Sequence, residues 1–107
     1  MQVVKIPEHL HTPNLLEKGV IIMPGRRGVG TGFVRLIPFS ENGHTDVMVN
    51  EVDFKPLRDM DVREAKDELL DDLKMLKRYL KRSFPNVDDS DIFTILRWNP
   101  TDEPRED

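Results

Sequence analysis

The stretch from Lys18 to Phe39 concentrates the residue types that bind phosphate. It reads KGVIIMPGRRGVGTGFVRLIPF and contains no acidic residue, although the whole chain has a net charge of -4. Glycines let backbone N–H groups approach a phosphate closely, and arginine guanidinium groups fork onto phosphate oxygens. The stretch is therefore a candidate nucleic-acid interface. Its candidate binding residues are Lys18, Arg26, Arg27 and Arg35.

Two apolar runs flank the glycines of this stretch. Residues 20–23 and 33–39 have the composition of strands, which predicts a hairpin with the two arginines at its tip. An ordinary solvated hairpin loop is the alternative interpretation. The loop sequence PGRRGVGTG has neither the Gly-Lys-Ser/Thr ending of a P-loop nor the spacing G-x-G-x-x-G. Binding of a nucleoside triphosphate is therefore not expected.

Further elements must position this basic stretch. A strand is predicted at residues 2–6, and one broken helix or two turns at residues 8–18, before Gly19. Asn42-Gly43 is a strong hairpin signal, and the strand that follows, residues 46–54, changes its alternation near Asn50–Glu51. This change predicts a β-bulge and a bent strand. Residues 92–98 form a final strand, central or barrel-closing, that is apolar on both faces except for Arg97.

One long amphipathic helix is predicted from Val62 to Ser83. Asp61 and Glu64 have the spacing of a capping box at its start. Apolar residues then recur at steps of three and four, with acids in the first half and five cations in the second. That division complements the helix dipole, so the cations need no ligand to explain them. A second basic patch around Tyr79 is the alternative.

The composition limits the remaining function classes. The 107 residues predict one domain, residues 1–98, followed by a charged tail, residues 99–107, that we expect to be disordered. The chain has no cysteine and three histidines, so no metal site and no cofactor are expected. No apolar run is long enough to span a bilayer, and the start does not resemble a signal peptide. A cytoplasmic monomer without membrane contact is the expectation.

The second half of the chain resembles the ASCH domain, a branch of the PUA-like superfold. The phrases that carry the resemblance are VNEVDFKPLRDM, DVREAKDELLDDLKMLKRYLKRSFP and DDSDIFTILRW. The resemblance implies an α+β fold: a small PUA-like β-barrel with one long amphipathic helix and one short helix. The family phrase G-x-K-x-x-T-x-R is largely missing here. Lys18 stands for its lysine, but Ile21 and Met23 occupy the threonine and arginine positions.

The resemblance implies an RNA-binding, or single-stranded nucleic-acid-binding, module whose basic cleft surrounds the glycine-rich hairpin. Some ASCH-like proteins are ribonucleases, and others are amidohydrolases that act on an acetylated cytidine. A hydrolase is therefore the first alternative, and Glu68 loosely matches the family glutamate. Ile21 offers no nucleophilic atom. The second alternative is an acidic protein-interaction module or nucleic-acid mimic, whose protein partner would bind the acidic face formed by Asp67, Asp71, Asp72, Asp88, Asp89 and Asp91.

Overall fold

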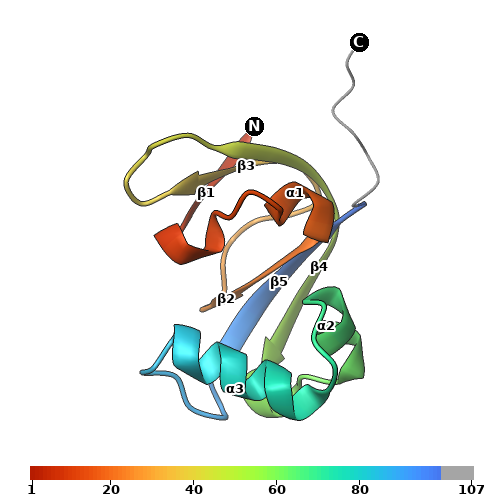
Figure 1. Ribbon diagram of the computed structural model, residues 1–107. Helices are drawn as coiled ribbons and strands as arrows, with labels where there is room; N and C mark the ends of the chain where they lie inside the picture. Colours follow the sequence, from red (N-terminus) through yellow and green to blue (C-terminus); the bar gives the residue numbers. More distant parts are fainter. Residues whose placement is uncertain (100–107) are drawn as a thin grey trace.

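The chain folds into a small α+β structure around one five-stranded mixed sheet (Figure 1), seen in a computed structural model that describes residues 1–99. The strand order is β1-β3-β4-β5-β2, with β1 and β3 parallel and the other neighbours antiparallel. The strands are β1 (Gln2–Ile6), β2 (Val20–Pro24), β3 (Gly32–Pro38), β4 (Thr45–Pro56) and β5 (Ile92–Trp98). The predicted tail at residues 99–107 lies outside the described residues from position 100 onward.

Helices cover the two ends of the sheet. Figure 1 shows α1 at the upper end of the molecule and α2 and α3 at the lower end. The α-helices are α1 (Leu15–Lys18), α2 (Val62–Asp67) and α3 (Leu73–Ser83), and two short 3₁₀ turns are η1 (Glu8–Leu10) and η2 (Leu57–Asp59). The pair η1 and α1 confirms the predicted break in residues 8–18. Gly19 ends α1 with a φ of 79°, as its position predicted.

The sheet separates two hydrophobic cores. The first joins inward-facing residues of all five strands to η1 and α1, for example Leu15 and Trp98. The second joins β2 and β5 to α2 and α3, for example Leu76 and Phe93. Strand β5 therefore has a core on each face, which explains its apolar sequence and confirms its predicted central position. The Trp98 indole N–H donates to the carbonyl of Leu16 at 2.9 Å.

The predicted hairpin of residues 20–23 and 33–39 is wrong. Strand β2 pairs with β5 at one edge of the sheet, whereas β3 lies between β1 and β4. The glycine-rich segment is therefore a connection between two separated strands and not a hairpin tip. Local sequence could not reveal this, because strand partners are chosen by burial across the whole sheet. The hairpin predicted at Asn42-Gly43 is confirmed by the antiparallel pairing of β3 with β4.

The sheet bends strongly without closing into a barrel. The register between β4 and β5 shifts between Val49 and Glu51, which confirms the predicted bulge. Figure 1 shows β4 curving from the end beside β3 to the end beside α2. Within residues 1–99, β1 pairs only with β3 and β2 only with β5, so these two strands are open edges. The expected closed barrel is therefore not observed.

The predicted helix from 62 to 83 is also wrong, because it is divided into α2 and α3. The capping box of Asp61 and Glu64 is present at the start of α2. After Asp67 the chain turns: Leu69 has a φ of 61°, its N–H donates to Lys66, and the N–H of Leu70 donates to Ala65. This is the Schellman pattern of hydrogen bonds that ends a helix. Glycine is the usual residue there, so the leucine concealed the break from sequence analysis.

Candidate functional site

Lys18 forms an ion pair with Glu68 where α1 and α2 end. Lys18 Nζ lies 2.9 Å from Glu68 Oε1, and the two side chains are only 16% and 5% exposed. Burial raises the pKa of Glu68, and the nearby charge of Lys18 offsets part of this effect. The contact joins residues 50 positions apart. The ion pair therefore joins the end of α1 to the end of α2 and places a proton donor next to a carboxylate.

Arg26 and Arg27 are neighbours with different environments. The exposed guanidinium of Arg26 lies 4.3 Å from the ring centre of Phe54, which is a cation–π contact. Arg27 donates from Nη1 to the carbonyl of Lys5 at 3.0 Å and from Nε to the carbonyl of Pro24 at 3.4 Å. These acceptors belong to β1 and β2. Arg27 therefore bridges the two open edges of the sheet.

The connection that carries these arginines is anchored by β5 and β1. The hydroxyl of Thr94 accepts from the N–H of Arg27 at 2.9 Å and donates to the carbonyl of Gly25 at 2.6 Å. Further along, the N–H of Gly30 donates to the side chain of Gln2 at 2.7 Å. Several of the groups expected to receive a phosphate are therefore engaged within the protein.

Arg35 is held by a carboxylate on the neighbouring strand. Its Nε and Nη2 donate to the two oxygens of Asp46 at 2.8 and 3.0 Å. This forked contact lowers the pKa of Asp46 below its ordinary range. Lys18, Arg26, Arg27 and Arg35 thus contact separate partners in different elements. Of the four, only Arg26 and Arg27 have no ion pair within residues 1–99.

An open groove of about 430 Å³ lies between the start of α1 and the start of β4. Pro13 and Leu16 supply its apolar surface, and hydrogen-bonding groups surround them. The hydroxyl of Thr45 lies 3.0 Å from Nε2 of His11, which fixes one side of the groove. Asp46, the partner of Arg35, lines the same groove, so Arg35 stands next to it. The remaining lining residues are Thr12 and His44.

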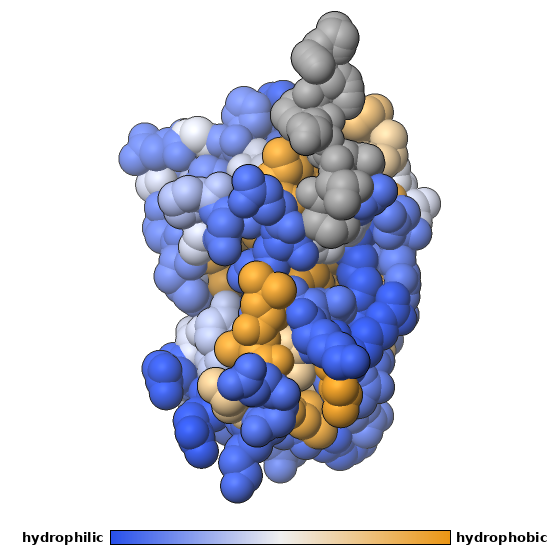
Figure 2. All heavy atoms as spheres, turned by 45° about the vertical axis from the view of Figure 1, so that its right-hand side comes forward, coloured by the Kyte–Doolittle hydropathy of each residue, from blue (hydrophilic) through white to orange (hydrophobic). Residues whose placement is uncertain are grey.

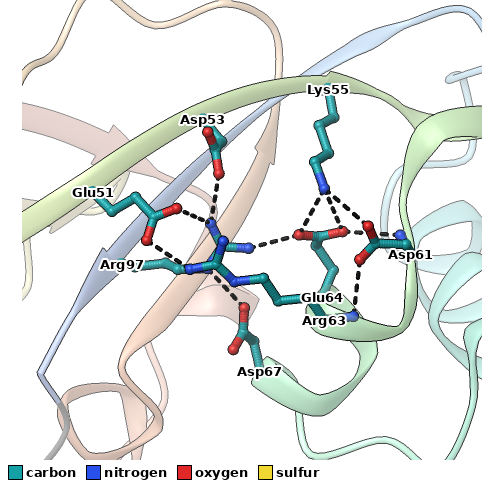
Figure 3. Close-up of polar contacts among 8 residues, drawn as sticks. All are labelled: Glu51, Asp53, Lys55, Asp61, Arg63, Glu64, Asp67 and Arg97. Carbon is teal, nitrogen blue, oxygen red and sulfur yellow. Dashed lines mark hydrogen bonds and ion pairs between the residues drawn. The ribbon is translucent and has the colours of Figure 1, made fainter.

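A buried arginine between the sheet and α2 was missed by sequence analysis. Figure 3 shows the guanidinium of Arg97 surrounded by carboxylates from β4 and α2. Arg97 is 6% exposed, and Glu64, which it contacts at 2.6 Å, is fully buried. Burial lowers the pKa of Arg97, but the hydrogen bonds that Arg97 donates to Asp67 and Asp53 outweigh it and raise that pKa. The other three contacts of Arg97 are Asp53 at 2.8 Å, Asp67 at 2.8 Å and Glu51 at 3.3 Å.

Two further cations complete this cluster. Lys55 contacts Glu64 at 3.0 Å and Asp61 at 3.5 Å, while Arg63 contacts Glu51 at 2.6 Å (Figure 3). The carboxylates are therefore shared among three positive groups. The signal in the sequence is the lone charge in the apolar strand at residues 92–98, together with charges at alternate positions of residues 51–55. The cluster fixes α2 against the sheet and has no free centre for a ligand.

Among residues 1–99, no group of three or more histidine, aspartate or glutamate side chains is arranged to hold a metal ion. In that part of the chain, no helix is long and apolar enough to cross a membrane.

Comparisons with known proteins add no identification. No family model, no curated protein and no solved structure matches this chain. The resemblance to the ASCH domain therefore remains a prediction from the sequence.

Proposed function

We propose that this chain is an ASCH-like, PUA-related module that binds RNA or another single-stranded nucleic acid. The observation that carries the proposal is the groove beside Arg35, at one end of the predicted basic stretch. Its volume of about 430 Å³ lies in the range of small-molecule sites, which suits one unpaired base. Sequence-specific recognition of RNA usually targets unpaired bases that leave the stack.

The lining of the groove suits a flat heterocycle. Pro13 and Leu16 offer apolar surface for a ring, while Thr12, Thr45 and His44 offer hydrogen-bonding groups for its edge. Asp46 accepts hydrogen bonds and would favour an edge that carries an N–H group. Because Asp46 already holds the guanidinium of Arg35, that cation is oriented in advance at the border of the groove.

The predicted basic residues then have separate tasks. Arg26 is exposed and free of ion pairs within residues 1–99, so it is available to neutralise a backbone phosphate. Arg27 mainly joins β1 to β2, and Lys18 is held by Glu68. Binding of a phosphate backbone releases counterions, so the affinity should fall as the salt concentration rises.

The test is a fluorescence-anisotropy titration with short single-stranded and duplex RNA and DNA at two salt concentrations. The variants Thr12→Met, which fills the groove, and His44→Ala, which removes a polar group, should each weaken single-strand binding about tenfold, or about 1.4 kcal/mol. Lys5→Gln serves as the control, because Lys5 pairs with Glu41 on an exposed surface outside the groove lining. Equal affinity of all variants would overturn the groove proposal.

A hydrolase is the second candidate, and the contact of Lys18 with Glu68 is the observation that favours it. These residues stand for the lysine and glutamate of the amidohydrolases in the resembling family. Ile21, at the position of the nucleophile, is 2% exposed and packs in the first core. Incubation with RNA and with acetylated cytidine, followed by chromatography, tests this candidate. Product that is lost in Lys18→Met and Glu68→Gln would favour the enzyme over the binding module.

An absence of nucleic-acid binding at low salt would leave the acidic protein-interaction module. Fewer carboxylates are available for a protein partner than the sequence suggested, because several of them have partners within this protein. Asp67 is bound to Arg97, Asp89 pairs with Lys81, and Asp88 accepts from Ser90 within its own turn.

A further inference from the structure

Helix α3 carries cations along its whole exposed side. Between Leu73 and Ser83 it contains no acidic residue, while Leu76 and Leu80 on its opposite side are fully buried. Within residues 1–99, Lys81 is the only one of its cations with an ion pair, to Asp89 at 3.2 Å. The five cations are Lys74, Lys77, Arg78, Lys81 and Arg82.

The division of the predicted long helix removes the structural reason for some of these charges. In one helix from 62 to 83, the five cations would lie in the C-terminal half, where the helix dipole favours positive charge. In the folded protein α3 begins at Leu73, so Lys74 lies in its first turn, where positive charge is unfavourable. The dipole now accounts only for Lys81 and Arg82, in the last turn.

Within residues 1–99, Asp89 is the only acid that forms an ion pair with a cation of α3. The carboxylate of Asp72 caps α3 and accepts from the N–H of Met75 at 2.9 Å. Asp88 and Asp91 accept backbone hydrogen bonds within the turn that follows α3. Four of the five cations are thus left without an ion pair within residues 1–99. Three of these four follow one another at intervals of four residues: Lys74, Arg78 and Arg82.

The spacing of these three side chains suits a linear polyanion. Residues four apart lie on the same side of a helix, and each step advances about 6 Å along its axis. Insertion into a membrane is not supported, because the apolar side of α3 is occupied by the core. Figure 2 shows apolar surface emerging among hydrophilic residues on the lower part of the face turned forward. Leu69, in the turn before α3, and Met75, within α3, are 73% and 39% exposed and supply apolar surface at the start of this part of the chain.

We propose that the exposed face of α3 binds the phosphate backbone of a nucleic acid through Lys74, Arg78 and Arg82. The proposed function supplies the class of ligand for this inference, but the surface is separate from the groove. The groove selects an unpaired base, whereas α3 neutralises phosphates without regard to sequence. Arginine is suited to this task because its fork contacts two phosphate oxygens at once.

The test is the salt dependence of RNA binding by the triple variant Lys74→Gln, Arg78→Gln and Arg82→Gln. A single strand loses about 0.7 in the slope of log K against log salt for each neutralised phosphate. The slope should therefore fall by about 2, and the affinity at low salt should fall at least tenfold. Glutamine preserves helix propensity, and the single variant Arg78→Gln should lower the slope by about 0.7 if the triple variant does not fold.

The matched control is Lys5→Gln, Arg58→Gln and Lys66→Gln, which removes three exposed cations outside α3. An equal loss in this control would overturn the proposal, since net charge alone would then explain the effect. An unchanged α3 variant beside weakened groove variants would overturn the proposal and leave the proposed function standing. A weakened α3 variant beside unchanged groove variants would support binding by α3 and reject the groove. Equal binding of polyglutamate would overturn phosphate as the ligand, and no binding of RNA by the wild type would reject both.

Discussion

The molecule contains two dense groups of charge that behave in opposite ways. Around Arg97, each charge has a partner within hydrogen-bond distance and the central groups are buried. Along α3, the cations lie on the surface, and those at positions 74, 78 and 82 have no ion pair within residues 1–99. The comparison teaches that charge density alone does not mark a binding surface. Only charges without an internal partner remain free to hold a ligand.

Replacing the central arginine should have the largest effect. Arg97→Met leaves four carboxylates facing one another, and loss of one partner of a buried ion pair typically costs about 3–5 kcal/mol. We expect a decrease of that size in the free energy of unfolding, measured with urea and circular dichroism. Arg78→Met on α3 is the control and should change it by less than about 0.5 kcal/mol. Similar losses in the two variants would erase the distinction between the two groups.

Removing the bridge that Arg27 forms between β1 and β2 should have the second-largest effect on stability. Arg27→Ala removes the side-chain hydrogen bonds to β1 and β2, and bonds from charged donors contribute about 1.5–3 kcal/mol each at most. We expect unfolding to become easier by about 2 kcal/mol. Arg26→Ala should cost only about 0.5–1 kcal/mol, the value of an exposed cation–π contact.

Variants of Arg26 and Arg27 should also distinguish an effect on stability from an effect on RNA binding. Arg26→Ala should weaken binding of single-stranded RNA in an anisotropy titration, because Arg26 is exposed and has no ion pair within residues 1–99. A stable Arg27→Ala protein together with an unfolded Arg26→Ala protein would contradict both assignments.

A substitution at Leu69, in the turn between α2 and α3, should have a smaller effect on the free energy of unfolding, and it should increase stability. Leu69 holds a left-handed conformation that costs a non-glycine residue about 1 kcal/mol, and its side chain is 73% exposed. Leu69→Gly should therefore stabilise the protein by about 0.5–1 kcal/mol in urea unfolding. Leu69→Ala keeps the strain and should not stabilise. A less stable glycine variant would show that the leucine side chain packs in the folded state.

The pH dependence of the free energy of unfolding should distinguish the buried carboxyl of Glu68 from the more exposed carboxyl of Asp46. These changes should be the smallest. Burial raises the pKa of Glu68, so the folded state binds more protons than the unfolded state between the two pKa values. Relative to Glu68→Gln, the wild type should gain stability as the pH falls from 7 through the raised pKa. Urea unfolding of both proteins at several pH values measures this difference.

Asp46 should show the opposite dependence. The hydrogen bond from Arg35 lowers the pKa of Asp46, so its contribution is present at neutral pH and is lost as the pH falls below about 3.9. The advantage of wild type over Asp46→Asn should therefore shrink in acid. A gain in acid would show that Arg35 does not stabilise the ionised carboxyl.

Local sequence determined the elements of this protein well. The alternation in residues 46–54 predicted the bulge of β4, Asp61 and Glu64 predicted a helix start, and Gly19 predicted the end of α1. These features depend on residues within a few positions of one another, so their physical causes are contained in the sequence. The run at residues 92–98, which is apolar on both faces except for Arg97, likewise predicted a central or barrel-closing strand, and the strand is central.

Tertiary structure alone decided which charges are free. The sequence placed Lys18, Arg27 and Arg35 in one basic stretch, but Glu68, the carbonyl of Lys5 and Asp46 hold them from other elements. The sequence also predicted one longer helix, in which the cations of α3 would lie in the half that the helix dipole favours. In the structure the turn at Leu69 ends α2, and these cations belong to a separate helix. Pairing of charges depends on contacts between residues far apart in the chain, and only the folded sheet brings those residues together.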